Sequence, residues 1–372
     1  MTDTTPPLLD LFLELARIPS PPGRERRVAD RAVDWLRAIG LEPIEDDAAA
    51  MIGGDTGNIV ARLDPTVDGV PIFLCAHLDT VVPEGPIEPS VEGGVVRNTA
   101  GTILGADNKA AVAVMLEAVR RLLSEQRPHA GLELVLTPKE ETGCDGAKAL
   151  DTDSLRAELG YVYDHAAPIG DVVGAAPYQQ TLDVTFTGRK AHAGIVPEEG
   201  RSAIAAAAKA ISELRLGRLD DDTTANVGLI RGGTARNIIP DHCQLTAEAR
   251  SLSEQRLLDV VGEMLDSLTF AAAVGECEVE TTIEEKYRGY RFGLDDPVVT
   301  LGFEALERAG ATPRLVTCGG GADANVFNDR GLPCLNLANA MMDIHTADEA
   351  IAVDDLDRML DVTLALVDCA RR

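Results

Sequence analysis

The stretch Pro71-Ile-Phe-Leu-Cys-Ala-His-Leu-Asp79 decides the fold, because a short apolar run ends directly in polar side chains. Its first six residues are bounded by turn residues and predict a buried strand. The same reasoning predicts strands at 58–63, 132–136 and 161–163, and helical periodicity predicts helices at 24–39 and 106–123. Strands that alternate with helices are typical of a mostly parallel sheet with helices on both faces, so we expect an α/β protein.

The pattern changes near Pro177, where strands and helices follow in the order β-α-β-β-α-β of a ferredoxin-like domain. These strands are predicted at 181–187, 225–230, 243–249 and 277–283, and the helices at 202–214 and 253–270. After Asp295 the alternation of helices with a strand resumes. We therefore expect residues 177–292 to be inserted into a discontinuous domain formed by residues 1–176 and 293–372.

Composition limits the partners of this 372-residue chain. Acidic residues outnumber basic ones by 61 to 34, and the net charge of -27 repels phosphate backbones and anionic membranes. We expect no nucleic-acid partner and no membrane contact. The seven cysteines are widely spaced without a C-x-x-C pair, and no apolar run reaches the ~18 residues of a membrane span. We therefore expect reduced thiols and a cytoplasmic location.

Several residues that can bind metal ions follow predicted strands: His77, Glu140, Glu141 and Asp164. Two further candidates lie elsewhere, because Asp107 opens a predicted helix and His345 follows a stretch of small residues and methionines. In open α/β sheets, sites form beyond the carboxyl ends of strands. Two histidines with several carboxylates suit zinc, cobalt or manganese, and one shared carboxylate would allow a pair of ions. A carboxylate left without a metal could act as a base, so this set of residues favours metal-assisted hydrolysis.

Five motifs resemble those of the peptidase T-like branch of the dinuclear zinc exopeptidases, which are relatives of aminoacylase and carboxypeptidase G. They are His77-Leu-Asp-Thr-Val81, Gly105-Ala-Asp-Asn-Lys109, Pro138-Lys-Glu-Glu-Thr-Gly143, Ala191-His-Ala-Gly194 and His345-Thr-Ala-Asp-Glu349. The resemblance covers essentially the whole chain. It implies a catalytic metallopeptidase domain and an inserted domain that serves as lid and as the surface of a homodimer.

The resemblance also implies a ligand set for two divalent ions, zinc first, with cobalt or manganese as alternatives. His77, Asp107 and Asp164 would hold one ion, and Asp107, Glu141 and His345 the other, so that Asp107 would bridge them. A cis peptide bond between Asp107 and the next residue is implied as well.

Further roles follow from the resemblance. Asp79 would accept a hydrogen bond from His77, and Glu140 would be the general base. His192 matches a lid histidine that reaches the developing oxyanion, in dimeric members from the partner subunit. Asn237 and Arg250 match substrate-binding positions, and the Arg250 guanidinium would pair with the C-terminal carboxylate of a peptide. A structural ion pair with a nearby acid is the competing interpretation of Arg250.

The chain departs from the family pattern at two positions. His165 directly follows a predicted ligand, where relatives usually carry a small residue, and we interpret it as a bystander or a support for the ligands. Ala322 replaces a common serine or threonine in the glycine-rich loop Gly319-Gly-Gly-Ala-Asp-Ala-Asn325.

Together these observations predict an enzyme that hydrolyses an amide bond in short peptides and releases the N-terminal residue of tripeptides. One alternative is a deacylase or carboxypeptidase that acts on N-acylated amino acids with the same metals. Another is a protein that binds peptides at a metal site without cleaving them. A nucleotide-binding protein is disfavoured, because no Lys-Ser or Lys-Thr pair follows the glycine-rich loop as in a P-loop.

Overall fold

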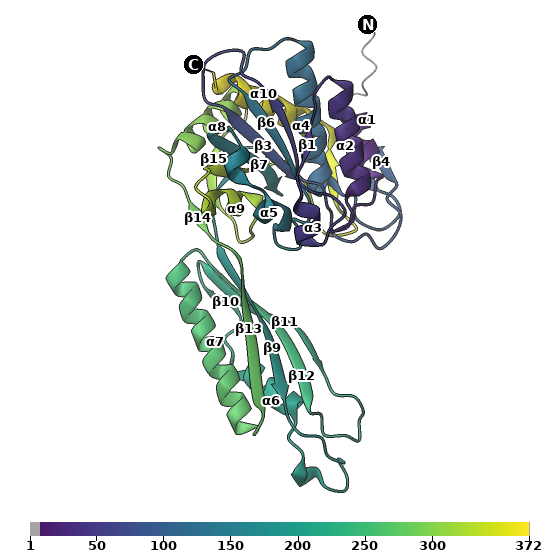
Figure 1. Cartoon of the computed structure of the whole chain (residues 1–372), viewed down its shortest axis with the longest axis vertical. Helices are drawn as coiled ribbons and strands as arrows, with labels where there is room; N and C mark the ends of the chain where they lie inside the picture. Colours follow the sequence, from purple (N-terminus) through teal and green to yellow (C-terminus); the bar gives the residue numbers. More distant parts are fainter. Residues whose placement is uncertain (1–7, 372) are drawn as a thin grey trace. The chain divides into compact units, whose positions relative to one another are not determined.

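The computed structural model describes residues 8–371 and divides them into two compact units (Figure 1). Unit 1 contains the described residues up to Ala175, Arg291–Cys318 and those from Ala322 onward. Unit 2 contains Ala176–Tyr290 and Gly319–Gly321. The main part of unit 2 is therefore inserted between two parts of unit 1. In the described part of the chain, no helix combines the length and apolar character that a membrane span requires.

Unit 1 is built on a mixed sheet that has nine strands among the described residues. The strands are β1 (Ile44–Glu45), β2 (Ile59–Leu63), β3 (Ile72–His77), β6 (Leu132–Thr137), β7 (Leu159–His165), β8 (Asp171–Ala176), β14 (Tyr290–Arg291), β15 (Arg314–Thr317) and β16 (Cys334–Ala338). Their order is β1-β2-β6-β3-β7-β16-β8-β14, with β15 beside β8. The central strands β6, β3, β7 and β16 are parallel, so their carboxyl ends lie at one edge.

Helices cover this sheet on both faces. They are α1 (Leu8–Ala16), α2 (Arg26–Ala38), α3 (Ala48–Ile52), α4 (Ala106–Ser124), α5 (Asp145–Ala149), α8 (Pro297–Arg308), α9 (Asp323–Asp329) and α10 (Val353–Cys369), with a 3-10 turn at Thr152–Ser154. Alternate β3 side chains face opposite layers. Leu74 lies in the main core with residues of α4 and α10, whereas Phe73 packs on Phe327 of α9 with ring centroids 4.7 Å apart.

A second, smaller sheet of unit 1 contains β17 (Ala350–Ala352), β5 (Val95–Asn98) and β4 (Pro89–Glu92). Strand β17 pairs with β5 in antiparallel fashion. This pairing holds the chain just after the segment that carries His345.

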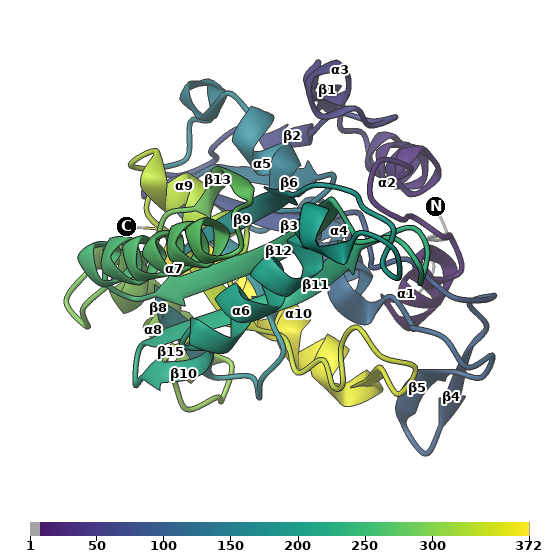
Figure 2. The same cartoon turned by 90° about the horizontal axis from the view of Figure 1, so that it is seen from below.

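Unit 2 is an antiparallel sheet with two long helices packed on one face (Figure 2). Its elements are β9 (Tyr178–Thr187), α6 (Ala203–Glu213), β10 (Gly217–Asp220), β11 (Thr223–Gly232), β12 (His242–Ser251), α7 (Glu254–Val274) and β13 (Glu278–Tyr287), with a 3-10 turn at Pro197–Glu199. Both helices begin at a serine, Ser202 or Ser253, whose hydroxyl accepts a hydrogen bond from a first-turn N–H. Their apolar faces enclose Leu182, Val184 and Phe186 of β9.

The predicted fold class, an α/β protein with a mixed, mostly parallel sheet and a β-α-β-β-α-β domain, is confirmed. The sequence patterns did not predict α9, β10, β16 or the small sheet. These elements are seven residues long or shorter, so no repeated hydrophobic period could identify them.

Candidate metal centre and active site

The predicted ligands come together because parallel strands end at the same edge of the unit 1 sheet. His77 is the last residue of β3, and Asp164 is the penultimate residue of β7, the neighbouring strand. Thr137 ends β6 on the other side of β3, and the turn after it carries Glu140 and Glu141. The structure thereby gathers residues that are more than 80 positions apart in the sequence.

Asp107 lies between the two predicted ligand histidines. Its Oδ1 atom is 3.1 Å from Nε2 of His77, and its Oδ2 atom is 3.1 Å from Nε2 of His345. Asp164 Oδ1 lies 3.6 Å from the same nitrogen of His77. Glu141 Oε1 lies 3.1 Å from that of His345. The two carboxylate oxygens of Asp107 therefore face two different sets of side chains that can bind a metal ion. The implied cis peptide bond between Asp107 and Asn108 is present.

The donors of each group can converge on one ion. In each of the groups His77, Asp107, Asp164 and Asp107, Glu141, His345, the ligand atoms lie within 4.8 Å of one another. Among the described residues, the only ion-pair partners of these three carboxylates are the two histidines. Buried carboxylates are stable when paired or bound to metal ions. The residues therefore fit a pair of divalent cations that share Asp107.

Charge governs the pKa values of the ligands. Hydrogen bonds to Asp107 and Glu141 raise the pKa of His345 to about 10. Burial would lower the pKa of His77, but hydrogen bonds to Asp107 and Asp164 outweigh burial and raise it. Burial and the negative charge of Asp107 raise the pKa of Asp164 to about 8. Protons and metal ions therefore compete for these ligands.

Asp79 holds the turn that carries Glu140 and Glu141. Its side chain is completely buried, Oδ1 accepts the Glu140 N–H at 2.9 Å, and Oδ2 accepts the Glu141 N–H at 3.1 Å. The hydrogen bond expected from His77 to the Asp79 carboxylate is replaced by a shorter contact with its backbone. His77 Nδ1 lies 2.9 Å from the Asp79 carbonyl oxygen and 3.4 Å from Oδ1. The backbone carbonyl thus sets the His77 tautomer.

Glu140 lies beside the metal-ligand groups, on the turn that begins at Pro138. Burial, and then the negative charge of Asp164, raise the pKa of Glu140 well above its usual range. The thiol of Cys144 donates to Glu140 Oε1 at 3.4 Å. Asp323, in the glycine-rich loop, accepts a 2.5 Å hydrogen bond from Thr137 Oγ1, and burial raises its pKa to about 6. A carboxyl group with a raised pKa is a stronger proton acceptor, as a general base requires.

In unit 2, His192 and Asn237 are neighbours. His192 forms an isolated bridge with Ile238, and the Ala193 N–H donates to the Asn237 carbonyl at 3.0 Å. Both residues are exposed on loops next to the start of β12. Arg250 lies near the opposite end of the same strand, opposite Gln179 of β9. The structure thus brings together two of the three residues that the sequence assigned to substrate contact in the inserted domain.

Arg250 already forms hydrogen bonds with other residues of unit 2. Its Nε and Nη2 atoms donate to the two carboxylate oxygens of Glu248 at 3.2 and 3.0 Å. Its Nη1 atom donates to the Tyr287 hydroxyl at 3.4 Å and to the Gly319 carbonyl at 3.2 Å. A substrate carboxylate would therefore compete with Glu248 for the guanidinium.

The two departures from the family pattern lie beside the centre. In the described chain, His165 belongs to neither ligand group, and its backbone carbonyl accepts N–H groups of Ala167 and Asn339. Ala322 is buried directly before α9.

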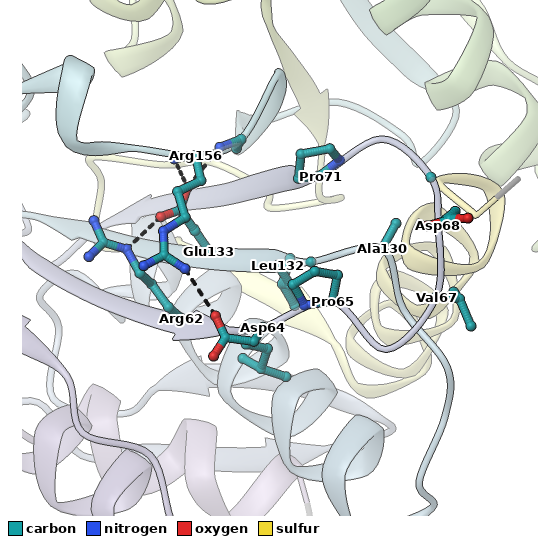
Figure 3. A pocket seen from close by; sticks show the side chains of 14 residues that line it. Arg62, Asp64, Pro65, Val67, Asp68, Pro71, Ala130, Leu132, Glu133 and Arg156 are labelled. Atoms are coloured by element: carbon teal, nitrogen blue, oxygen red, sulfur yellow. Dashed lines mark hydrogen bonds and ion pairs between the residues drawn. The ribbon is translucent and has the colours of Figure 1, made fainter.

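The pocket in Figure 3 lies at the opposite edge of the unit 1 sheet. It has a volume of about 380 Å³, and it is lined by Leu132, the first residue of β6, and by Pro71, which directly precedes β3. Two ion pairs lie among its lining side chains: Arg62 with Glu133 at 2.7 Å, and Arg156 with an exposed aspartate. The pocket does not reach the predicted ligands, because they lie at the carboxyl ends of these strands.

Sequence reasoning missed three supporting residues. Asn336 of β16 accepts the Asp164 N–H at 2.8 Å and donates to the Asp164 carbonyl at 3.0 Å. Lys109 is fully buried, burial lowers its pKa to about 7, and its Nζ donates to the Ile18 carbonyl at 2.5 Å. Glu349 binds backbone N–H groups of the Asp107 segment. Only the tertiary structure shows the partners of Asn336 and Lys109, whereas the position of Glu349 in the motif His345-Thr-Ala-Asp-Glu349 was a signal that could have identified it.

Two family models match the chain. Peptidase family M28 matches residues 58–173, and the peptidase dimerisation domain matches residues 179–276. The first range lies in unit 1 and contains four of the five predicted metal ligands, whereas the second lies in unit 2. Together, the fold, the ligand groups and these matches define a metal-binding peptidase with an inserted dimerisation domain.

Solved structures place the chain more narrowly. The aminopeptidase PepT of Bacillus cereus is 39% identical, with 98% of each chain covered and a TM-score of 0.88. A tripeptidase of Staphylococcus aureus is 36% identical, with the same coverage and a TM-score of 0.93. A dinuclear metal-binding peptidase of the M20 family from Bacillus subtilis has the same fold at 16% identity, covering 97% of this chain and 96% of its own, with a TM-score of 0.73. The chain belongs to the peptidase T-like aminopeptidase family.

Proposed function

We propose that the protein is a dinuclear metal-dependent aminopeptidase that releases the N-terminal residue of tripeptides and similar short peptides. The observation that carries this proposal is the position of Asp107, whose two oxygens face His77 and His345 at 3.1 Å each. The aminopeptidase and tripeptidase relatives at 39% and 36% identity support the reaction class. The seven cysteines are all free, which supports our proposal of a reducing compartment, the cytoplasm.

Two divalent ions, for which we propose zinc, would be held by the two ligand groups that share Asp107. When bound, such ions polarise the scissile carbonyl and lower the pKa of water. The role of the protein is to hold the reacting groups in place. Glu140 would accept a proton at its carboxylate and pass it to the leaving amine. The Asp79 carboxylate holds Glu140 and Glu141 in place by accepting hydrogen bonds from their backbone N–H groups.

The inserted domain would complete the site from a second subunit. The eight residue steps along β12 from His242 to Arg250 span about 27 Å, whereas an extended tripeptide spans about 10 Å. His192 and Asn237 lie beside the loop that precedes His242. In one subunit, His192 and Arg250 are therefore too far apart to contact the same tripeptide. We propose a homodimer in which His192 acts on the partner's substrate, and the dimerisation-domain match supports this assembly.

The decisive experiment measures metal content and cleavage together. The metal-free protein is loaded with zinc, cobalt or manganese, bound metal per chain is determined, and the products formed from tri-alanine are compared with those formed from N-acetyl-tri-alanine. Glu140→Gln should retain about two metals and lose about 10²- to 10⁴-fold in kcat. Glu158→Gln, an exposed carboxylate at the other edge of the sheet, is the matched control and should retain full activity.

The outcome separates the alternatives. Cleavage of tri-alanine but not of its N-acetylated form supports an aminopeptidase. Release of acetate from the acetylated form would show a deacylase with the same centre, and release of its C-terminal alanine would show a carboxypeptidase. Two bound metals without any cleavage would point to a peptide-binding protein, and failure to bind metal would refute the proposed ligand set.

A further inference from the structure

The segment 342–350 forms a loop that is closed at its base. The Met342 N–H donates to the Ala350 carbonyl at 2.9 Å, and the Ala350 N–H donates back at 3.0 Å. The loop carries His345, whose side chain is 46% exposed, and Glu349, which is only 2% exposed. One exposed and one buried side chain thus extend from the same short loop.

The Glu349 carboxylate binds the segment that leads into Asp107. Its Oε2 atom accepts the N–H groups of Leu104 and Gly105 at 2.7 and 2.8 Å. Its Oε1 atom accepts the Asp107 N–H at 2.9 Å. Three backbone donors therefore converge on one buried carboxylate, which comes from a position 242 residues further along the chain than Asp107.

These donors lie in the segment that leads into α4, where the backbone at Asp107 and Asn108 departs from helical geometry. Gly105 precedes the helix with a left-handed φ of 77°, and no local side chain caps the first turn. Backbone N–H groups without a partner in the helix make this segment favourable for a hydrogen-bond acceptor. Glu349 supplies that acceptor, and the left-handed Gly105 turns its own N–H and that of Leu104 toward it.

We infer that Glu349 is a positioning residue that fixes Asp107 relative to His345 before any metal ion binds. This inference rests on the proposed function, because it takes both residues as metal ligands. The same closed loop contacts the Asp107 segment twice, through His345 Nε2 and through the Glu349 carboxylate. The contact through Glu349 is buried and needs no cation, so it can hold the site ready for metal.

Neutralising Glu349 should weaken metal binding. The Gln side chain in Glu349→Gln keeps one acceptor oxygen, and its amide group turns a donor toward backbone N–H groups. Loss of a group that orients metal ligands typically costs 10- to 100-fold in metal affinity. The matched control is Asp348→Asn, which removes the same charge from an exposed position on the same loop.

The test uses the full-length metal-free protein and two readouts. Zinc affinity is measured by competition with a chromophoric chelator, and backbone amide exchange is followed at residues 104–107 without metal. Glu349→Gln should bind at least one ion 10-fold or more weakly, and its Leu104, Gly105 and Asp107 amides should exchange faster. Asp348→Asn should stay within about twofold of wild type in both readouts.

A third variant keeps the inference testable if Glu349→Gln does not fold. Glu349→Asp keeps the charge but shortens the side chain by one methylene group, and it should shift both readouts in the same direction by a smaller factor. Wild-type zinc affinity and amide exchange in a folded Glu349→Gln or Glu349→Asp protein would overturn the inference alone. Failure of the wild type to bind metal would overturn the proposed function, and this inference with it.

Discussion

The turn that carries Glu140 and Glu141 depends on Asp79, so Asp79→Asn should loosen it. Both Asp79 oxygens accept backbone N–H groups of this turn, at 2.9 and 3.1 Å, from a fully buried position. The Asn side chain keeps one acceptor oxygen and turns its NH₂ group toward the other N–H. His77 should be little affected, because its Nδ1 contacts the Asp79 backbone carbonyl at 2.9 Å.

The expected loss of free energy follows from these two hydrogen bonds. A hydrogen bond to a charged group contributes about 1.5–3 kcal/mol, and a buried N–H left without an acceptor costs about 1–3 kcal/mol. Because part of the turn can relax toward solvent, we expect a total loss of about 2–4 kcal/mol. If all of it appeared in activity, kcat/KM would fall by about 30- to 700-fold.

Two measurements together capture this loss. Urea unfolding of the metal-free protein gives the change in the free energy of unfolding, and tri-alanine cleavage at saturating zinc gives the change in kcat/KM. Asp145→Asn is the matched control, since Asp145 contacts the same turn from a more exposed position, 3.1 Å from Lys139 Nζ and 2.8 Å from Thr142 Oγ1. Exposed ion pairs contribute little, so this control should lose less than about 1 kcal/mol.

Two results would refute this reasoning. A combined loss in Asp79→Asn no larger than that of the Asp145 control would show that the turn does not depend on the carboxylate. Selective loss of the ion bound by the His77 group, with the turn intact, would show that Asp79 acts on the histidine, as the sequence alone had suggested.

Three further predictions follow from the structure. The raised pKa values of Asp164, about 8, and His345, about 10, mean that protons must leave before metal binds, so zinc affinity should rise and proton release should fall as pH increases from 6 to 10. Leu229 is 52% exposed on β11, whose outer edge beyond Ala225 is not paired with β10, so Leu229→Lys should weaken a dimer 10-fold or more in sedimentation experiments. Glu248→Gln should lower the KM of tripeptides several-fold, because Glu248 competes for Arg250.

Each of these predictions has a result that would contradict it. Zinc affinity independent of pH would mean that the ligands are already deprotonated in the metal-free protein. For the dimer, Leu258→Lys on the exposed side of α7 should leave the association unchanged, and equal weakening by both variants would argue against the β11 edge. An unchanged KM in Glu248→Gln, combined with an unchanged KM in Arg250→Lys, would remove Arg250 from substrate binding.

The core strands and long helices could be predicted because each repeats its pattern over enough residues. The helix α4 and the strand β3 are long or apolar enough to be recognised locally. The residue types of the centre could also be predicted, since His77 and Asp164 lie at the ends of apolar runs. The resemblance supplied the pairing of ligands, which spacing alone leaves open.

The sequence by itself determined the fold class, because this depends on hydrophobic periodicity along the chain, and it indicated which polar residues follow the strands. Only the tertiary structure decided which atoms meet. It showed Asp79 bonded to the Glu140 turn, Arg250 engaged by Glu248, and Glu349 bonded to the start of α4. Such contacts join residues through backbone N–H groups and side-chain directions, which are fixed only when distant segments pack together and leave no periodic trace in the sequence.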